Sequence, residues 1–192
     1  MKTKPARERL LDAANDLFYR EGVQTVGIDR VIEEAGVAKA SLYNTFGSKE
    51  ALVRAYLEAR HAGTTDRLLA AVEGETDPRA RLLAVFDAQG ELFAQPGFRG
   101  CAFATASAEA PGGGLVEKAA DEYRADIRGL LTRLAEEAGA ADPVVLGRQL
   151  QLIYDGAGLG ARMDRDPSTA HVARAAAEQL IDAAIRPSAS PR

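Results

Sequence analysis

The sequence is poor in the residues that crosslink a chain or bind metals. Its 192 residues include one cysteine, two histidines and no tryptophan. Cys101 cannot form a disulfide within the chain, which is typical of proteins from reducing compartments. His61 and His171 are far apart and lack the paired spacing of a zinc site. We therefore expect a cytoplasmic protein with no metal and no cofactor.

Long apolar runs and common catalytic motifs are also missing. No run approaches the length of about 18 apolar residues that a spanning helix needs, so we expect neither a membrane segment nor a signal peptide. The glycine-rich stretch GAGLG (156–160) lies in a helical pattern rather than after a strand, which favours close helix packing over nucleotide binding. We expect that the protein is not an enzyme.

The charge of the chain is unevenly distributed. The formal net charge is −4, but residues 1–60 carry ten Lys and Arg against nine Asp and Glu, a net of +1. Four cations face one acid before residue 11. A basic cluster suits phosphate binding, although an ordinary solvated terminus would look the same.

The stretch 27–53 has the pattern of two short helices joined by a tight turn. Apolar residues in 28–35 recur at helical spacing, and Gly36 follows as a residue suited to the left-handed conformation that ends a helix. Leu42 and Phe46 would face inward from the second helix, and Ser48 would cap the helix after it. The outward residues of the second helix are polar or aromatic, which suits contacts to phosphates and base edges. This pattern is a helix-turn-helix, although a plain helical hairpin shares its periodicity.

The sequence AGVAKASLYNTFGSKEALV (35–53) closely resembles the DNA-binding segment of the TetR family of bacterial transcriptional repressors. The resemblance covers residues 6–57. It implies an all-α fold of about nine helices, with a three-helix head in residues 1–47 and a ligand-binding and dimerisation body in 48–186. The last residues, PSASPR (187–192), are expected to form a disordered tail. The residues expected to contact DNA are Lys4, Gly27, Lys39, Ala40, Ser41, Tyr43, Asn44 and Lys49.

Three positions depart from the family pattern. Gly27 stands where relatives usually have Thr or Ser, so a hydroxyl contact to phosphate is lost and a backbone N–H would have to replace it. Many relatives carry Arg and His at the positions of Asn44 and Thr45, so their operator sequences cannot be transferred to this chain.

Helical patterns continue through the body, at about 48–73, 77–94, 101–109, 115–138, 142–163 and 166–185. Gly63 is expected to loosen the first of these helices midway. The middle helices would enclose a mostly apolar cavity, although aromatic residues at this spacing also suit a plain core. The residues proposed to bind a ligand are Phe86, Gln89, Phe93, Phe98, Phe103, Tyr123, Tyr154 and Asp155.

The last two helices are rich in glycine and alanine, which allow helices to approach closely. The resemblance implies that they form a four-helix interface with a second copy, while a tightly packed core within one chain would have the same composition. The residues expected at this interface are Leu150, Ile153, Ala157, Ala161, Ala173, Ala177 and Leu180.

The function implied is that of a ligand-responsive repressor. A homodimer would bind a palindromic operator in double-stranded DNA and be released by a small, mostly apolar effector. The alternative is a small-molecule binding or scaffold protein with a degenerate DNA-binding head, which the near-neutral head charge and Gly27 favour. Cys101 is expected to pack as a small buried apolar side chain, and a redox-sensing role stays open.

Overall fold

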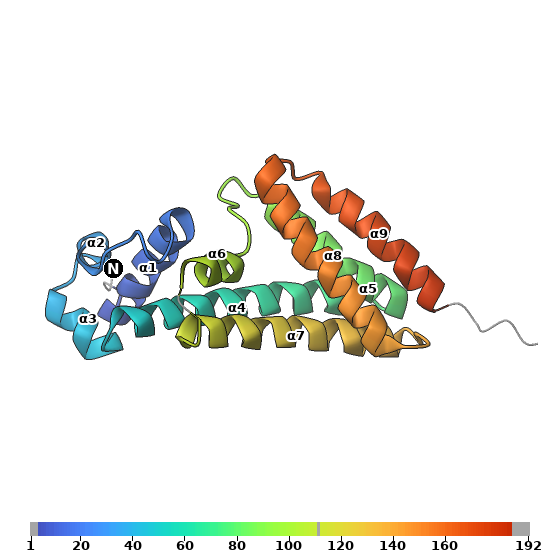
Figure 1. Ribbon diagram of the computed structural model, residues 1–192, viewed down its shortest axis with the longest axis horizontal. Helices are drawn as coiled ribbons and strands as arrows, with labels where there is room; N and C mark the ends of the chain where they lie inside the picture. The colour runs from blue at the N-terminus through green and yellow to red at the C-terminus, as the bar shows by residue number, and fades with distance from the viewer. Residues whose placement is uncertain (1–3, 111, 186–192) are drawn as a thin grey trace, which may run out of the picture. The chain divides into compact units, whose positions relative to one another are not determined.

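The computed structural model describes residues 4–110 and 112–185, and within them every regular element is a helix. Figure 1 shows their succession along the chain. The all-α prediction is confirmed. The helices of this part of the chain are α1 (Ala6–Glu21), α2 (Ile28–Ala35), α3 (Lys39–Phe46), α4 (Lys49–Glu73), α5 (Pro78–Phe93), α6 (Ala102–Glu109), α7 (Leu115–Glu137), α8 (Pro143–Asp164) and α9 (Thr169–Ala184).

These helices pack as two compact units. The first comprises the described residues within 1–63 and 101–123, and the second those within 64–100 and 124–192. Helices α4 and α7 each contribute to both units. The predicted division after residue 47 stays a prediction, and the predicted tail at 187–192 lies outside the described residues.

In the first unit, α1 packs against α2 and α3, forming a three-helix head (Figure 1). The apolar stripe of α1 is buried against Val31 of α2 and Leu42 of α3, both fully inaccessible to solvent. Burial of such side chains contributes roughly 2 kcal/mol each. The apolar spacing read from the sequence therefore identifies the core of the head.

Capping residues fix the short elements of the head. Gly36 ends α2 in the left-handed conformation, with φ 59° and ψ 43°. Its N–H bonds to carbonyls of the last turn of the helix, as the sequence predicts. Ser48 accepts a hydrogen bond from the N–H of Ala51 at 3.1 Å and so caps α4. Helix α3, between them, spans eight residues and ends at Gly47, which has φ 80°.

The second unit brings together α5, α8 and α9, which pack on one another (Figure 1). Asp77 and Asp142 each cap a helix whose first residue is proline, as predicted. Gly147 of α8 lies so close to α7 that an added Cβ would stand 3.0 Å from the backbone nitrogen of Thr132. A small residue is therefore required at that crossing.

Helix α4 runs without interruption from Lys49 to Glu73, so the expected loosening at Gly63 does not appear. The exposed Gly63 would have open space around an added Cβ. The cost of one glycine, about 1 kcal/mol, is small against the burial of the apolar residues of this helix.

Candidate nucleic-acid interface

The outer surface of α3 carries the residues expected to contact DNA. Leu42 is buried, whereas Lys39, Ala40 and Asn44 are exposed and Ser41 is half-buried. Tyr43 keeps 47% of its surface accessible, which is unusual for an aromatic side chain that serves only packing. The hydroxyl of Thr45 donates to the carbonyl of Ser41 at 2.6 Å. The structure thus brings the predicted α3 residues together on an open surface, and their contact with DNA stays a prediction.

Gly27 precedes α2 in an extended conformation, with φ −77° and ψ 155°, and has no side chain with which to cap the helix. An added Cβ would meet nothing within 4 Å. Space for a larger residue is therefore available, and the missing hydroxyl is not forced by packing.

Each of the three lysines expected to contact DNA has a partner inside the protein. Lys4 Nζ lies 2.7 Å from Asp12 Oδ2, and Lys39 Nζ lies 2.8 Å from Asp29 Oδ1. The hydrogen bond to the aspartate raises the pKa of each of these lysines above its ordinary value.

Lys49, the third of these lysines, is half-buried, and its Nζ lies 3.5 Å from the carbonyl oxygen of Gln24. The contact ties the first turn of α4 to the segment between α1 and α2. Phosphate binding by this side chain would therefore take place beside the end of α1.

Arg9 has a structural role that the sequence does not indicate. Its Nη1 donates to the carbonyl oxygens of Ala35 at 3.1 Å and Gly36 at 2.8 Å. Carbonyls at the end of a helix carry partial negative charge and lack helical partners, so a guanidinium satisfies them. Although Arg9 belongs to the basic cluster of the N-terminal region, it fastens α1 to α2.

Glu109, the last residue of α6, reaches the segment that joins α1 to α2. Its Oε2 accepts a hydrogen bond from the N–H of Gln24 at 2.9 Å. The carboxylate occupies the space beside Gly22, where an added Cβ would lie 2.4 Å from Oε1. Because this contact joins residues 85 positions apart, the sequence pattern gives no sign of it.

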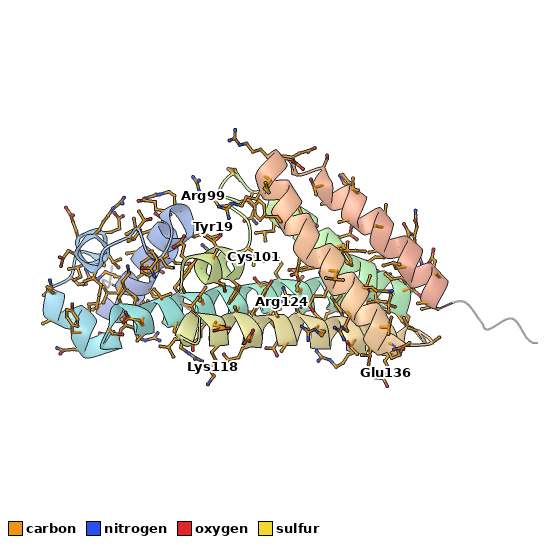
Figure 2. All side chains as sticks on the ribbon, in the orientation of Figure 1. Tyr19, Arg99, Cys101, Lys118, Arg124 and Glu136 are labelled. Carbon is orange, nitrogen blue, oxygen red and sulfur yellow. The ribbon has the colours of Figure 1, made fainter. Side chains whose placement is uncertain are left out.

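A second group of contacts in the first unit joins α1 to α4. The guanidinium carbon of Arg60 lies 3.8 Å from the ring centre of Tyr19. Burial raises the pKa of the neighbouring Tyr56 to about 12. Cys101 is only half-buried at the N-cap of α6; Figure 2 labels Tyr19 and Cys101.

The eight residues proposed to bind a ligand fall into two sets. Phe103 and Tyr123 belong to the first unit and stack with ring centres 4.1 Å apart, with His61 edge-on to both. The other six belong to the second unit: Phe86, Gln89, Phe93, Phe98, Tyr154 and Asp155.

Within the second unit, buried Gln89 donates to the carbonyl of Tyr154 at 2.8 Å. Asp155 accepts from Arg124 at 2.6 Å (Arg124 is labelled in Figure 2). The neighbouring Gln151 is also buried; it accepts from Arg128 and donates to the carbonyl of Arg124. Gln151 and Arg124 were not predicted from the sequence, although a glutamine within the apolar stripe of α8 is a detectable signal.

The residues predicted at a dimer interface are mostly core residues of the chain itself. Leu150, Ala157, Ala161, Ala173 and Ala177 are buried without any partner, and only Ile153 and Leu180 keep part of their surface. Because α5, α8 and α9 of one chain pack on one another, these five side chains are not on its outer surface. Large apolar side chains are instead exposed elsewhere on these two helices: Leu152 at 70%, Leu159 at 57%, Met163 at 72% and Val172 at 71%.

The described residues contain neither a candidate metal site nor a membrane-spanning helix. No cluster of three His, Cys, Asp or Glu side chains among them could hold a metal ion. Among the helices within 4–110 and 112–185, none is both long and apolar enough to cross a membrane.

Comparisons with known proteins agree with a helix-turn-helix regulator. Residues 10–56 match the family model described as bacterial regulatory proteins, tetR family. The HTH-type transcriptional repressor NemR of Escherichia coli K12 is 30% identical over 171 residues, which cover 83% of this chain and 85% of NemR. An uncharacterized HTH-type transcriptional regulator of Mycobacterium tuberculosis is 32% identical over 82 residues, and the match spans only 41% of that relative.

Solved structures show the same similarity over nearly the whole chain. A TetR-family transcriptional regulator from Streptomyces coelicolor has a TM-score of 0.89 at 33% identity, covering 94% of this chain and 96% of that one. The reduced form of E. coli NemR has a TM-score of 0.81 at 28% identity, covering 91% and 95%. The fold and the exposed α3 define a transcriptional regulator with a DNA-binding head. The chain belongs to the TetR family of transcriptional regulators.

Proposed function

We propose that this protein is a ligand-responsive repressor that binds a palindromic operator as a homodimer and is released by a small, mostly apolar effector. The observation that carries the proposal is the surface of α3, where Tyr43 and Asn44 are exposed. An α-helix fits into the major groove of DNA, and these two side chains would face the DNA. The similarity to NemR, a repressor by name, favours repression over activation.

In this proposal α3 lies in the major groove. Asn44 reads base edges, with adenine preferred if its amide bonds in a bidentate manner. Ser41 contacts bases or nearby phosphates, and Lys39, Tyr43 and Lys49 bind phosphates. An effector in the body releases DNA because it binds the DNA-incompetent state more tightly, as linkage requires.

The proposed dimer uses the exposed apolar face of α8 and α9 rather than the residues buried beneath it. Leu152, Leu159 and Met163 lie at helical spacing on one side of α8. Exposed apolar side chains grouped in this way mark an interaction surface. Two copies related by a two-fold axis would bury this face and present two heads to a palindromic site.

DNA binding tests the first part of the proposal. Fluorescence anisotropy would compare the DNA upstream of the protein's own gene with a scrambled duplex at two salt concentrations. We expect tighter binding to the upstream DNA, weakened by salt in both cases. Asn44→Ala should abolish the preference while keeping most of the affinity for scrambled DNA, and an unchanged preference would show that Asn44 does not read bases.

Sedimentation equilibrium tests the second part. Leu152→Glu places a charge on the proposed interface and should shift the protein from dimer to monomer. Leu115→Glu, at an exposed position on α7, is the matched control and should stay dimeric. A dimer that withstands Leu152→Glu would rule out this face.

A second candidate function is a small-molecule binding protein whose head no longer reads DNA. The pairing of Lys4 and Lys39 with aspartates and the missing hydroxyl at Gly27 favour it. Equal or absent binding of upstream and scrambled DNA would support this candidate.

A further inference from the structure

The two lysines at the exposed surface of the head are held by carboxylates of the same head. The Lys39–Asp29 pair joins α3 to α2, and the Lys4–Asp12 pair fastens the residues before α1 to α1 itself. The side chains of Lys39 and Asp29 remain 61% and 80% exposed. An ion pair this open to water is weak, so a DNA phosphate can compete for the lysine.

Asp29 also lies where a phosphate is expected. It is the second residue of α2, and Gly27 immediately precedes that helix. The N–H groups at a helix start attract anions, and Asp29 is an acidic residue of the protein in this first turn. Asp29 does not fill space in the core, because most of its side chain is in solvent.

We propose that Asp29 is an internal counter-ion of Lys39 that weakens DNA binding by the head and reduces its salt dependence. The inference rests on the proposed function, because it assumes that Lys39 binds a phosphate. Asp12 stands in the same relation to Lys4.

The physical reason is the exchange of ions on binding. When a free lysine contacts DNA, the duplex releases a condensed cation, which steepens the decline of log K with log salt by about 0.9 per contact. When Lys39 leaves Asp29 for a phosphate, the bared carboxylate attracts a cation from solution. This uptake offsets part of the release, so the contact adds less affinity and less salt dependence than a lysine without a carboxylate partner would add.

The alternative is that the pair only fastens α2 to α3. In that case removing the charge of Asp29 would change the stability of the head and leave the salt dependence of binding untouched. The two explanations therefore differ in a quantity that can be measured without an operator.

The test uses the full-length protein and a labelled random-sequence duplex of about 30 base pairs, titrated by anisotropy between about 50 and 200 mM KCl. Asp29→Asn keeps the size of the side chain and removes its charge. We expect binding about two- to fivefold tighter at the lowest salt. The slope should steepen by a fraction of the about 0.9 that a wholly new phosphate contact would add.

Glu34→Gln is the matched control, because it changes the net charge equally and lies on the same helix. The hydrogen bond to Glu21 is the main cause of the raised pKa of Arg20, and the Glu34 carboxylate adds to it. Glu34 is not among the groups that raise the pKa of Lys39. We expect its effect on affinity to be less than half that of Asp29→Asn, with an unchanged slope. Urea unfolding of both variants would verify that the heads are folded.

A double variant separates pairing from simple repulsion. In a Lys39→Gln background, Asp29→Asn should gain little, because no lysine is released. A full gain in that background would show that Asp29 repels DNA directly and would overturn the counter-ion role.

The remaining outcomes are also decisive. If Asp29→Asn and Glu34→Gln behave alike while the wild type binds DNA, the inference fails and the proposed function stands. If the folded wild type binds no duplex at any salt, both fail.

Discussion

Replacing Gly22 by alanine tests the contact between α6 and the head. Gly22 has φ 95° and ψ 151°, a conformation that is essentially restricted to glycine, so an alanine there costs about 1–3 kcal/mol. Its Cβ would also lie 2.4 Å from Glu109 Oε1 and push the carboxylate away from the N–H of Gln24. Loss of that charge-assisted hydrogen bond adds about 1.5 kcal/mol.

We therefore expect Gly22→Ala to lower the free energy of unfolding by about 2.5–4.5 kcal/mol. Glu109→Ala alone should cost about 1.5 kcal/mol. In the double variant the hydrogen bond can be lost only once, so its cost should match that of Gly22→Ala rather than the sum.

Urea unfolding at one fixed protein concentration is the assay, because a dimer would make the stability concentration-dependent. Gly63→Ala is the control for the exchange of glycine for alanine: it lies in a helix with open space around it and should stabilise by up to about 1 kcal/mol. Additive costs in the double variant would show that Glu109 and Gly22 do not meet. A neutral Gly22→Ala would refute the strain.

Three further outcomes are expected. Because the folded-state pKa of Tyr56 is raised to about 12, its neutral form stabilises the fold below pH 10, and this contribution of up to about 3 kcal/mol is lost as pH rises from 10 to 12. Tyr56→Phe should flatten that loss in unfolding measured against pH, and an unchanged alkaline slope would contradict the burial. Gly147→Ala should cost about 1–3 kcal/mol through its clash with Thr132, measured by thermal unfolding, and a neutral effect would show that α7 and α8 are less close. Arg79→Ala breaks ion pairs with Glu178 and Asp182 but should lower the free energy of unfolding by only about 1 kcal/mol, because all three side chains are a third or more exposed. A several-fold larger cost in urea unfolding would show that water does not reach these ion pairs.

Local signals in the sequence identify most of the fold. Gly36, Ser48, Asp77 and Asp142 end or begin helices where predicted, because a cap depends on residues within one turn. Apolar periodicity likewise identifies the buried side of each helix in the head.

The surfaces were harder to predict because they depend on residues distant in the chain. Helix α8 has apolar residues on two sides, and its sequence alone does not reveal which side its own chain covers. The structure assigns the side with Leu150 to the core and leaves the side with Leu152 exposed. The contacts of Glu109 with Gln24 and of Lys39 with Asp29 depend in the same way on tertiary packing.

The order in which the chain is synthesised has a consequence for the first unit. This unit combines residues within 1–63 with 101–123, so the stretch 64–100 leaves the ribosome between its two parts. The three helices of the head emerge first, but the carboxylate of Glu109 that holds Gln24 is added much later. Domains generally fold as units during synthesis, so completion of this first unit must await α6 and the start of α7. The unit that contains the proposed DNA-binding helix is therefore complete only after more than half of the chain has been synthesised.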